Sequence, residues 1–110
     1  MSASPTENIV FLIGELKGVS RNGETKNGAR MVRRVISVAR HWTDPSGKFH
    51  EDFDDFEVVS WGQVAQQLEE IENGALVRIK GRIKVERWYD GEETKSAIRI
   101  AAENVVVLCY

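Results

Sequence analysis

Apolar and β-branched residues gather in five stretches of the chain, and turn-forming residues separate these stretches. The first stretch, 8–16, reads NIVFLIGEL and is apolar over most of its length. The others span 29–42, 53–61, 75–89 and 94–110. Short apolar segments of this composition, bounded by Asn-Gly, Pro-Ser-Gly and Asp-Gly, are typical of β-strands. The pattern therefore predicts five strands.

The segments between the strands carry turn chemistry. Residues 18–28 hold two Asn-Gly pairs, which tolerate positive φ, so a loop is expected there. Residues 43–49 and 90–93 are expected to be turns. Residues 1–7 lack a basic or apolar signal region and are expected to be a flexible lead-in. A chain of 110 residues suits one domain, which we place at 8–110.

One stretch has a helical rather than a strand period. Val64, Leu68 and Ile71 are spaced at i, i+4 and i+7, and Asn-Gly follows them. Five strands with a helix between the third and the fourth is the order of an OB-fold, an all-β, five-stranded Greek-key barrel. Gly81 lies in the middle of the fourth strand, and we expect closure of the barrel to bend the strand at this glycine. An unrelated small β-sandwich or barrel is the alternative.

The fourth strand has two chemically different faces. By alternation, the barrel interior should receive Val77, Ile79, Gly81, Ile83 and Val85. The opposite face should carry Arg78, Lys80, Arg82, Lys84, Glu86 and Trp88. Cations roughly 6.6 Å apart match the phosphate repeat of an extended single strand, and an exposed indole offers a surface on which any base can stack. The alternative is a solvated face with a lone exposed tryptophan.

A second region combines cations with aromatic rings. It lies on the second and third strands and contains Arg33, Arg34, Arg40, Trp42, Phe56 and Trp61. Such interleaving favours sequence-tolerant binding of single-stranded nucleic acid. Duplex recognition is less apt, because the one expected helix is acidic and has no basic recognition face. The net charge of −2 means that any electrostatic attraction must be local.

The chain has no recognisable catalytic or metal-binding set. His41 and His50 are its only histidines, and no nucleophile stands at a recognisable spacing from either. The acidic run at 51–57 lacks the ligand order of a calcium loop and is expected to be a solvated edge or a partner-facing patch. Cys109 lies in an apolar run, so a packed or inert thiol is expected. We therefore expect no enzyme activity, cofactor, metal site or membrane span.

Three segments carry a family resemblance. NIVFLIGEL resembles the opening strand of bacterial single-stranded DNA-binding proteins (SSB), and VISVARHWTDPSGKFHEDFDDFEVVSWGQVAQQL resembles their central segment. NGALVRIKGRIKVERWYDG resembles their fourth strand, and the likeness runs from Asn8 to Leu108. It implies sequence-tolerant binding of single-stranded DNA in replication, recombination and repair, with replication or repair proteins as further partners. It also implies a cytoplasmic, nucleoid-associated protein, while bacterial, phage and organellar origins stay open.

The resemblance also assigns roles to residues. Trp42, Trp61 and Trp88 fall where the family places base-stacking aromatics, and Lys84 and Arg87 fall where it places phosphate contacts. At a further aromatic position this chain has an aspartate, so either the adjacent Phe56 substitutes in a shifted register or one stacking site is lost. The complete expected DNA-binding set is Arg33, Arg34, Arg40, Trp42, Phe56, Trp61, Arg78, Lys80, Arg82, Lys84, Arg87 and Trp88.

Self-association is expected at the first strand. Its unbroken apolar run is Ile9, Val10, Phe11, Leu12 and Ile13. A strand that is apolar on both faces is covered on both, and a second subunit is the expected outer cover, with a helix or loop of the same chain as the alternative. The resemblance implies a homotetramer, with a dimer as the second choice.

The end of the chain raises an alternative function. Typical members of the family continue into a disordered tail with an acidic tip, whereas this chain ends in VVVLCY. Either that tail is missing here, or the chain resembles the dimeric, tailless PriB-type proteins. The second reading makes it an interaction module that assembles a replication or primosome complex, and the acidic 51–57 run favours it.

Overall fold

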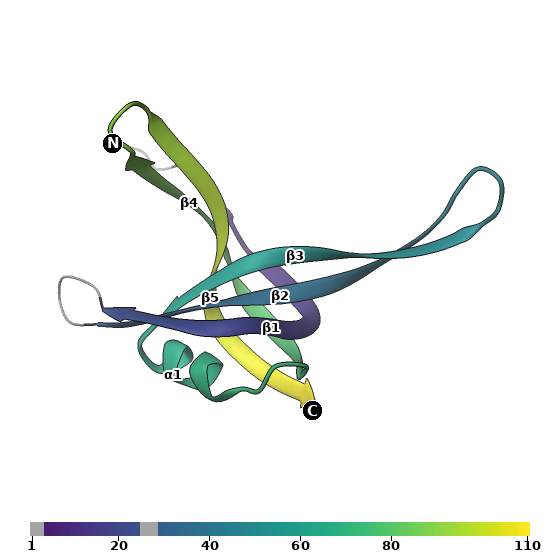
Figure 1. The fold of residues 1–110 in the computed structure, drawn as a ribbon, viewed down its shortest axis with the longest axis horizontal. Helices are drawn as coiled ribbons and strands as arrows, with labels where there is room; N and C mark the ends of the chain where they lie inside the picture. Colours follow the sequence, from purple (N-terminus) through teal and green to yellow (C-terminus); the bar gives the residue numbers. More distant parts are fainter. Residues whose placement is uncertain (1–3, 25–28) are drawn as a thin grey trace.

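The chain forms five strands and one helix in the computed structural model, which describes residues 4–24 and 29–110. In chain order these are β1 (Val10–Glu24), β2 (Arg30–Thr43), β3 (Phe49–Trp61), α1 (Gly62–Glu70), β4 (Leu76–Tyr89) and β5 (Thr94–Cys109) (Figure 1). Residues 1–3 and 25–28 lie outside the described residues, and with them part of the expected lead-in and of the expected 18–28 loop.

The strands close into a barrel in the order β1-β2-β3-β5-β4. β1 pairs with both β2 and β4, and these ladders are antiparallel, as are those of β2 with β3 and of β4 with β5. A short parallel pairing between β3 and β5 completes the closure. This strand order, with α1 between β3 and β4, confirms the expected OB-fold.

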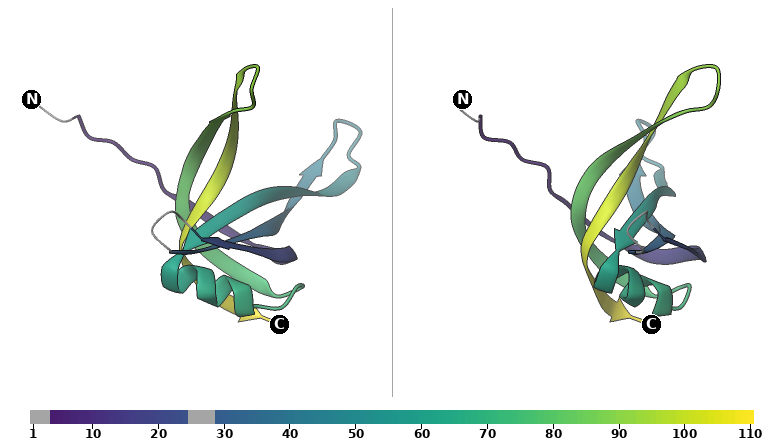
Figure 2. Two further views of the ribbon diagram at one scale, coloured as in Figure 1. Left: turned by 60° about the vertical axis from the view of Figure 1, so that its left-hand side comes forward. Right: turned by 90° about the vertical axis from the view of Figure 1, so that its left-hand side faces the viewer.

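The helix closes one end of the barrel (Figures 1 and 2). Ala65 and Leu68 are fully buried and join a core cluster with residues of all five strands, among them Ile36 and Ile79. Burying this apolar face supplies most of the stability of so short a helix, because an isolated helix of nine residues is marginal in water. The expected helical face is therefore confirmed.

Gly81 stands where the backbones of β4 and β5 approach each other closely. A Cβ at this position would overlap the carbonyl oxygen of Ala101 in β5. The β4–β5 register shifts between Lys80 and Gly81, so that β5 carries one extra residue at this point. Only glycine fits such an approach without displacing backbone, which supports the expectation that this residue serves barrel closure.

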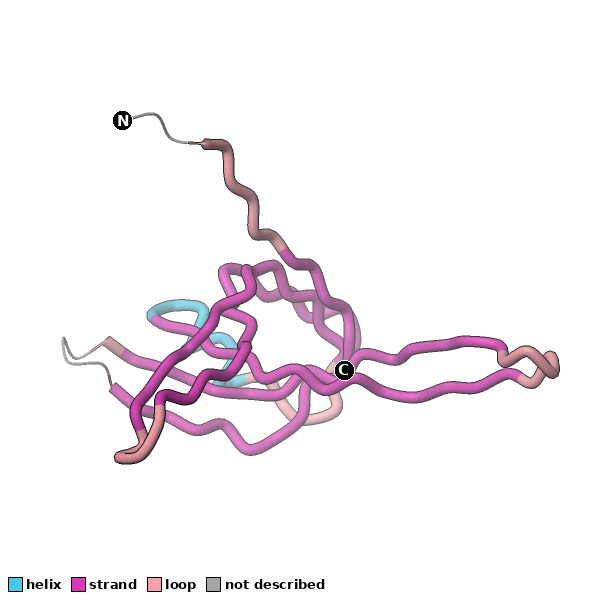
Figure 3. The backbone as a smooth tube through the Cα atoms, turned by 90° about the horizontal axis from the view of Figure 1, so that it is seen from above, coloured by secondary structure: helices cyan, strands magenta, loops and turns pink. Residues whose placement is uncertain are grey.

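Two hairpins continue beyond the barrel as arms, which point in different directions (Figures 2 and 3). The β2–β3 arm comprises residues 38–54, and its ladder extends to the pair Thr43 and Phe49. The β4–β5 arm comprises residues 82–99, beyond the last pairing of β1 with β4 at Val10 and Gly81. Because each arm is a two-stranded ribbon outside the core, its side chains are available to a ligand.

Three strand expectations need correction. β1 continues to Glu24 instead of ending before a loop at 18, because its backbone pairs with β2 after a register shift between Lys17 and Arg21. β3 begins at Phe49 rather than 53, which shortens the expected 43–49 turn. The expected inner face of β4 is correct as far as Gly81 but wrong beyond it, where the strand leaves the barrel. Ile83 and Val85 are exposed by 45% and 41%.

Candidate nucleic-acid interface

An open groove of about 850 Å³ lies between the barrel end of β2–β3 and the β4–β5 arm. Five of the twelve residues expected to bind DNA line this groove. They are Arg33, Trp61, Lys84, Arg87 and Trp88. The structure therefore brings cations and indoles from three different strands to one surface, as a stacking and phosphate-binding site requires.

Strand pairing explains how the aromatic rings reach the groove. Trp61 is the partner of Met31 at the end of the β2–β3 ladder, and both line the groove. The ammonium of Lys84, on β4, lies 4.4 Å from the centroid of the Trp61 ring and makes a cation–π contact. Trp88, further along the β4–β5 arm, is 44% exposed. One indole is thus covered by a cation, while the other presents an open face.

The groove also contains charged residues outside the expected DNA-binding set. Arg99 lies opposite Lys84 in the β4–β5 ladder, and the carboxylates of Glu57 and Glu86 lie within 3.6 Å of its Nε. Counting the register back from the Asp-Gly turn would have placed Arg99 beside Lys84. Alternation along the fourth strand placed Glu86 on the face of its cations, but nothing in the sequence indicated that Glu57 would lie beside it in the groove.

Trp42 and Arg40 lie elsewhere, on the β2–β3 arm. The Trp42 ring stacks on His50 with centroids 4.4 Å apart and an interplanar angle of 18°. The guanidinium of Arg40 lies 5.6 Å from the Trp42 centroid and 3.8 Å from Asp52. These two expected residues form a second aromatic platform, separate from the groove.

Asp44 holds the turn at the tip of that arm. Its Oδ1 accepts hydrogen bonds from the Ser46 hydroxyl and from the backbone N–H groups of Ser46 and Lys48, and its Oδ2 lies 2.8 Å from Nε2 of His50. The Ser46 hydroxyl, followed by His50 and the Lys48 N–H, lowers the pKa of Asp44 to about 2. The carboxylate thereby connects the turn to the ring on which Trp42 stacks.

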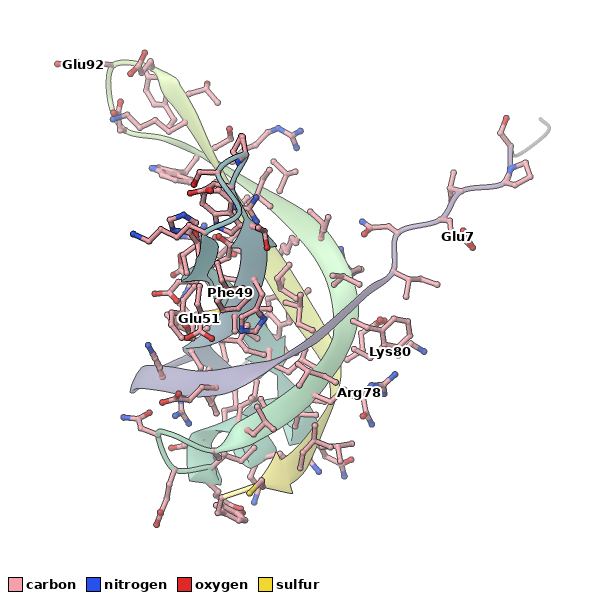
Figure 4. All side chains as sticks on the ribbon, turned by 90° about the vertical axis from the view of Figure 1, so that its right-hand side faces the viewer. Glu7, Phe49, Glu51, Arg78, Lys80 and Glu92 are labelled. Carbon is pink, nitrogen blue, oxygen red and sulfur yellow. The ribbon has the colours of Figure 1, made fainter. Side chains whose placement is uncertain are left out.

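Arg78 and Lys80 project from the outer surface of β4, away from the barrel (Figure 4). The Arg78 guanidinium lies 4.7 Å from the centroid of Phe11 on β1. Arg82 is exposed but does not line the groove. The row of cations on β4 is therefore divided, with Lys84 in the groove and its first two members on a different surface.

Arg34 and Phe56 point into the protein, so the expectation that they contact DNA is not supported by their placement. Arg34 is only 4% exposed, and its guanidinium donates hydrogen bonds to the carbonyls of Leu68 and Ile71 and to Oδ1 of Asn73. Arg34 thereby satisfies carbonyl groups at the C-terminal end of α1. Burial of its guanidinium lowers the pKa of Arg34. Phe56 is partly buried and packs against the core cluster.

The apolar run of β1 divides between its two faces. Val10 and Leu12 pack against the core, whereas Ile9, Phe11 and Ile13 are exposed by 57%, 53% and 51%. Val106 and Leu108 of β5 are also exposed, and Val106 pairs with Arg78, which in turn pairs with Ile13. Directly paired residues share a face of the sheet, so these side chains form one outer surface.

The remaining chemistry of the described residues is sparse. Among the side chains that the structure describes, no three of His, Cys, Asp or Glu are grouped so that they could hold a metal ion. The Cys109 thiol is exposed rather than packed, because it follows the last core residues of β5. In the described part of the chain, α1 is much too short to cross a bilayer, and no other helix could do so.

Solved structures of single-stranded DNA-binding proteins share this fold. A deletion mutant of the single-stranded DNA binding protein from Thermus aquaticus superposes with a TM-score of 0.81 at 28% identity, over 93% of this chain and 50% of that one. The Plasmodium falciparum SSB in complex with ssDNA gives a TM-score of 0.84 at 15% identity, over 97% and 99% of the two chains. The fold is thus that of a single-strand-binding OB barrel.

Sequence comparison gives the family. The Single-strand binding protein family matches residues 7–108. The Single-stranded DNA-binding protein of Aquifex aeolicus is 31% identical over 99 residues, which cover 89% of this chain and 67% of that protein. Single-stranded DNA-binding protein 1 of Chlorobaculum tepidum is 28% identical over 92% of this chain and 64% of its own length. The chain belongs to the single-strand binding protein family and spans about two thirds of these relatives.

Proposed function

We propose that this protein binds single-stranded DNA with little regard to sequence and protects it during replication, recombination and repair. The observation that carries the proposal is the groove, where Trp61 and Trp88 lie among Arg33, Lys84 and Arg87. Indole rings stack on any base and cations attract the phosphates, so the contacts do not depend on base identity. Membership of the family supports the same activity.

The β2–β3 arm extends the same chemistry. Trp42 is 38% exposed and is held in place by its stack on His50, with Arg40 beside it. An ordered ring loses little conformational freedom when a base stacks on it. We therefore assign the strand a path that passes through the groove and reaches this second platform.

A competition experiment tests this function. A labelled oligo-dT should bind at low salt, and unlabelled single strands of mixed sequence should displace it far better than duplexes of the same length. The reason is that stacked, paired bases cannot lie on Trp88. Equal displacement by duplex and single strand would contradict the proposal.

We also propose that the protein assembles into a homo-oligomer, with a tetramer as the expected state. The outer surface exposes the apolar side chains of Ile9, Phe11, Ile13 and Val106 in the single chain, with the guanidinium of Arg78 beside the Phe11 ring. Apolar strand surfaces of this kind are covered by a partner in stable proteins. Several chains on one strand would also raise the effective concentration of each later contact.

A further inference from the structure

Four charged side chains, one from each of four strands, meet on the wall of the groove. They are Arg33 of β2, Glu57 of β3, Glu86 of β4 and Arg99 of β5, here called the charge ring. Arg33 lies 3.8 Å from Glu57 and 3.5 Å from Glu86. Arg99 lies 3.3 Å from Glu57 and 3.6 Å from Glu86. Each guanidinium therefore faces both carboxylates.

The contacts within the charge ring are loose. Charge-assisted N–H···O bonds are about 2.7–2.9 Å long, and all four separations exceed this range. Nε and Nη1 of Arg99 are buried and make no hydrogen bond with any described residue. The guanidinium groups thus keep donor capacity that the carboxylates leave unused. A phosphate oxygen that displaced a carboxylate could use these donors, because arginine recognises phosphate through paired N–H groups.

We propose that Glu57 and Glu86 are built-in competitors for the phosphates of the bound strand. This inference rests on the proposed function. In the free protein the two carboxylates neutralise Arg33 and Arg99, and an incoming phosphate displaces them. The groove therefore holds DNA less tightly than its four cations alone would, which favours release and redistribution along the strand.

A rigid clamp between the β2–β3 and β4–β5 pairs is the competing explanation of the charge ring. The exposed fractions of its side chains range from 15% for Arg99 to 44% for Glu57. Ion pairs that solvent reaches contribute little to stability, so a clamp built from them would be weak. The two explanations predict opposite effects of removing the carboxylates.

The test replaces both carboxylates by amides, in the variant Glu57→Gln/Glu86→Gln. At low salt, each removed charge about 7 Å from a phosphate should raise the affinity for oligo-dT roughly threefold in water, and the pair about tenfold. The salt dependence should steepen by about 0.7 log units per decade for each guanidinium that gains a phosphate contact. Glu70→Gln/Glu103→Gln, the same change in net charge outside the groove, is the matched control.

The outcomes separate the inference from the proposed function. If the wild-type protein does not bind single-stranded DNA, the proposed function itself fails. If the wild type binds but the groove variant binds equally or more weakly, or the control variant gains as much, the competitor role is overturned and the proposed function stands. Thermal unfolding checks the fold of each variant. Should the double variant not fold, the two single variants decide by the same comparison.

Discussion

At the scale of single residues, Trp88 offers the groove an indole ring with an open face. The residue is 44% exposed, and no cation is placed over its ring among the described contacts. Trp88→Ala should weaken binding by about 1–3 kcal/mol, the contribution of one base stacked on an aromatic ring. The loss should be similar for oligo-dT, oligo-dC and oligo-dA in parallel titrations.

The neighbouring residue provides a matched control for this substitution. Tyr89 is an exposed aromatic on the same arm, but alternation places it on the opposite face and it does not line the groove. Tyr89→Ala should leave the affinity nearly unchanged. A loss confined to one base type in Trp88→Ala, or equal losses in both variants, would contradict the stacking account.

Arg34 shows why residue type alone does not identify a binding cation. Arg34→Met should lower the free energy of unfolding by about 2–4 kcal/mol, because it leaves the carbonyls of Leu68 and Ile71 without donors. Urea unfolding measures this loss, and Arg40→Met, at an exposed site on the arm, should change stability by about 0.5 kcal/mol or less. If Arg34→Met left stability unchanged but weakened DNA binding, Arg34 would instead be a residue that contacts DNA.

At the scale of elements, the turn of the β2–β3 arm depends on an ionised Asp44. Its pKa in the folded protein is about 2, below the 3.8 of an unperturbed aspartate, so its carboxylate stabilises the turn above about pH 4. This stabilisation is lost as the pH falls from about 4 towards 2. The amide resonances of Ser46 and Lys48 should therefore titrate with a midpoint near 2. A midpoint near 4 would show that the carboxylate is not bonded as described.

The elements also show where alternation stops being informative. The pattern of β4 predicted a buried face correctly for Val77 and Ile79, because these residues lie within the barrel. It failed for Ile83 and Val85, since a strand that leaves its barrel no longer has an interior to face. The position of that exit depends on the last pairing with β1, which the sequence of β4 does not contain.

At the scale of the whole molecule, we expect the outer surface of β1 and β5 to form the subunit interface of a tetramer. Light scattering should give a mass about four times the 12.4 kDa of one chain. Phe11→Glu places a charge on this surface and should yield smaller species, whereas Phe49→Glu, at an exposed site on the β2–β3 arm, should not. A monomeric wild type, or a Phe11→Glu variant of unchanged mass, would contradict the assigned surface.

The sequence predicted the fold better than it predicted the site. Strand order and the position of α1 follow from local pattern, and both are confirmed. Trp61, Lys84 and Trp88 meet in one groove as their types suggested, but Phe56 and Arg34 turned inwards and Arg78 lies on another surface. The site depends on which strands pair and where each leaves the barrel, and these are properties of the folded chain.

In the proposed complex, indole rings in the groove stack on the bases of a single strand. The most direct test of this stacking is a titration of tryptophan fluorescence with oligo-dT of increasing length, at low salt and again at high salt. We expect strong, saturable quenching, and an affinity that falls by about 0.7 log units per phosphate contact for each decade of salt. Fluorescence that stays unchanged when DNA is saturating at low salt would contradict the stacking.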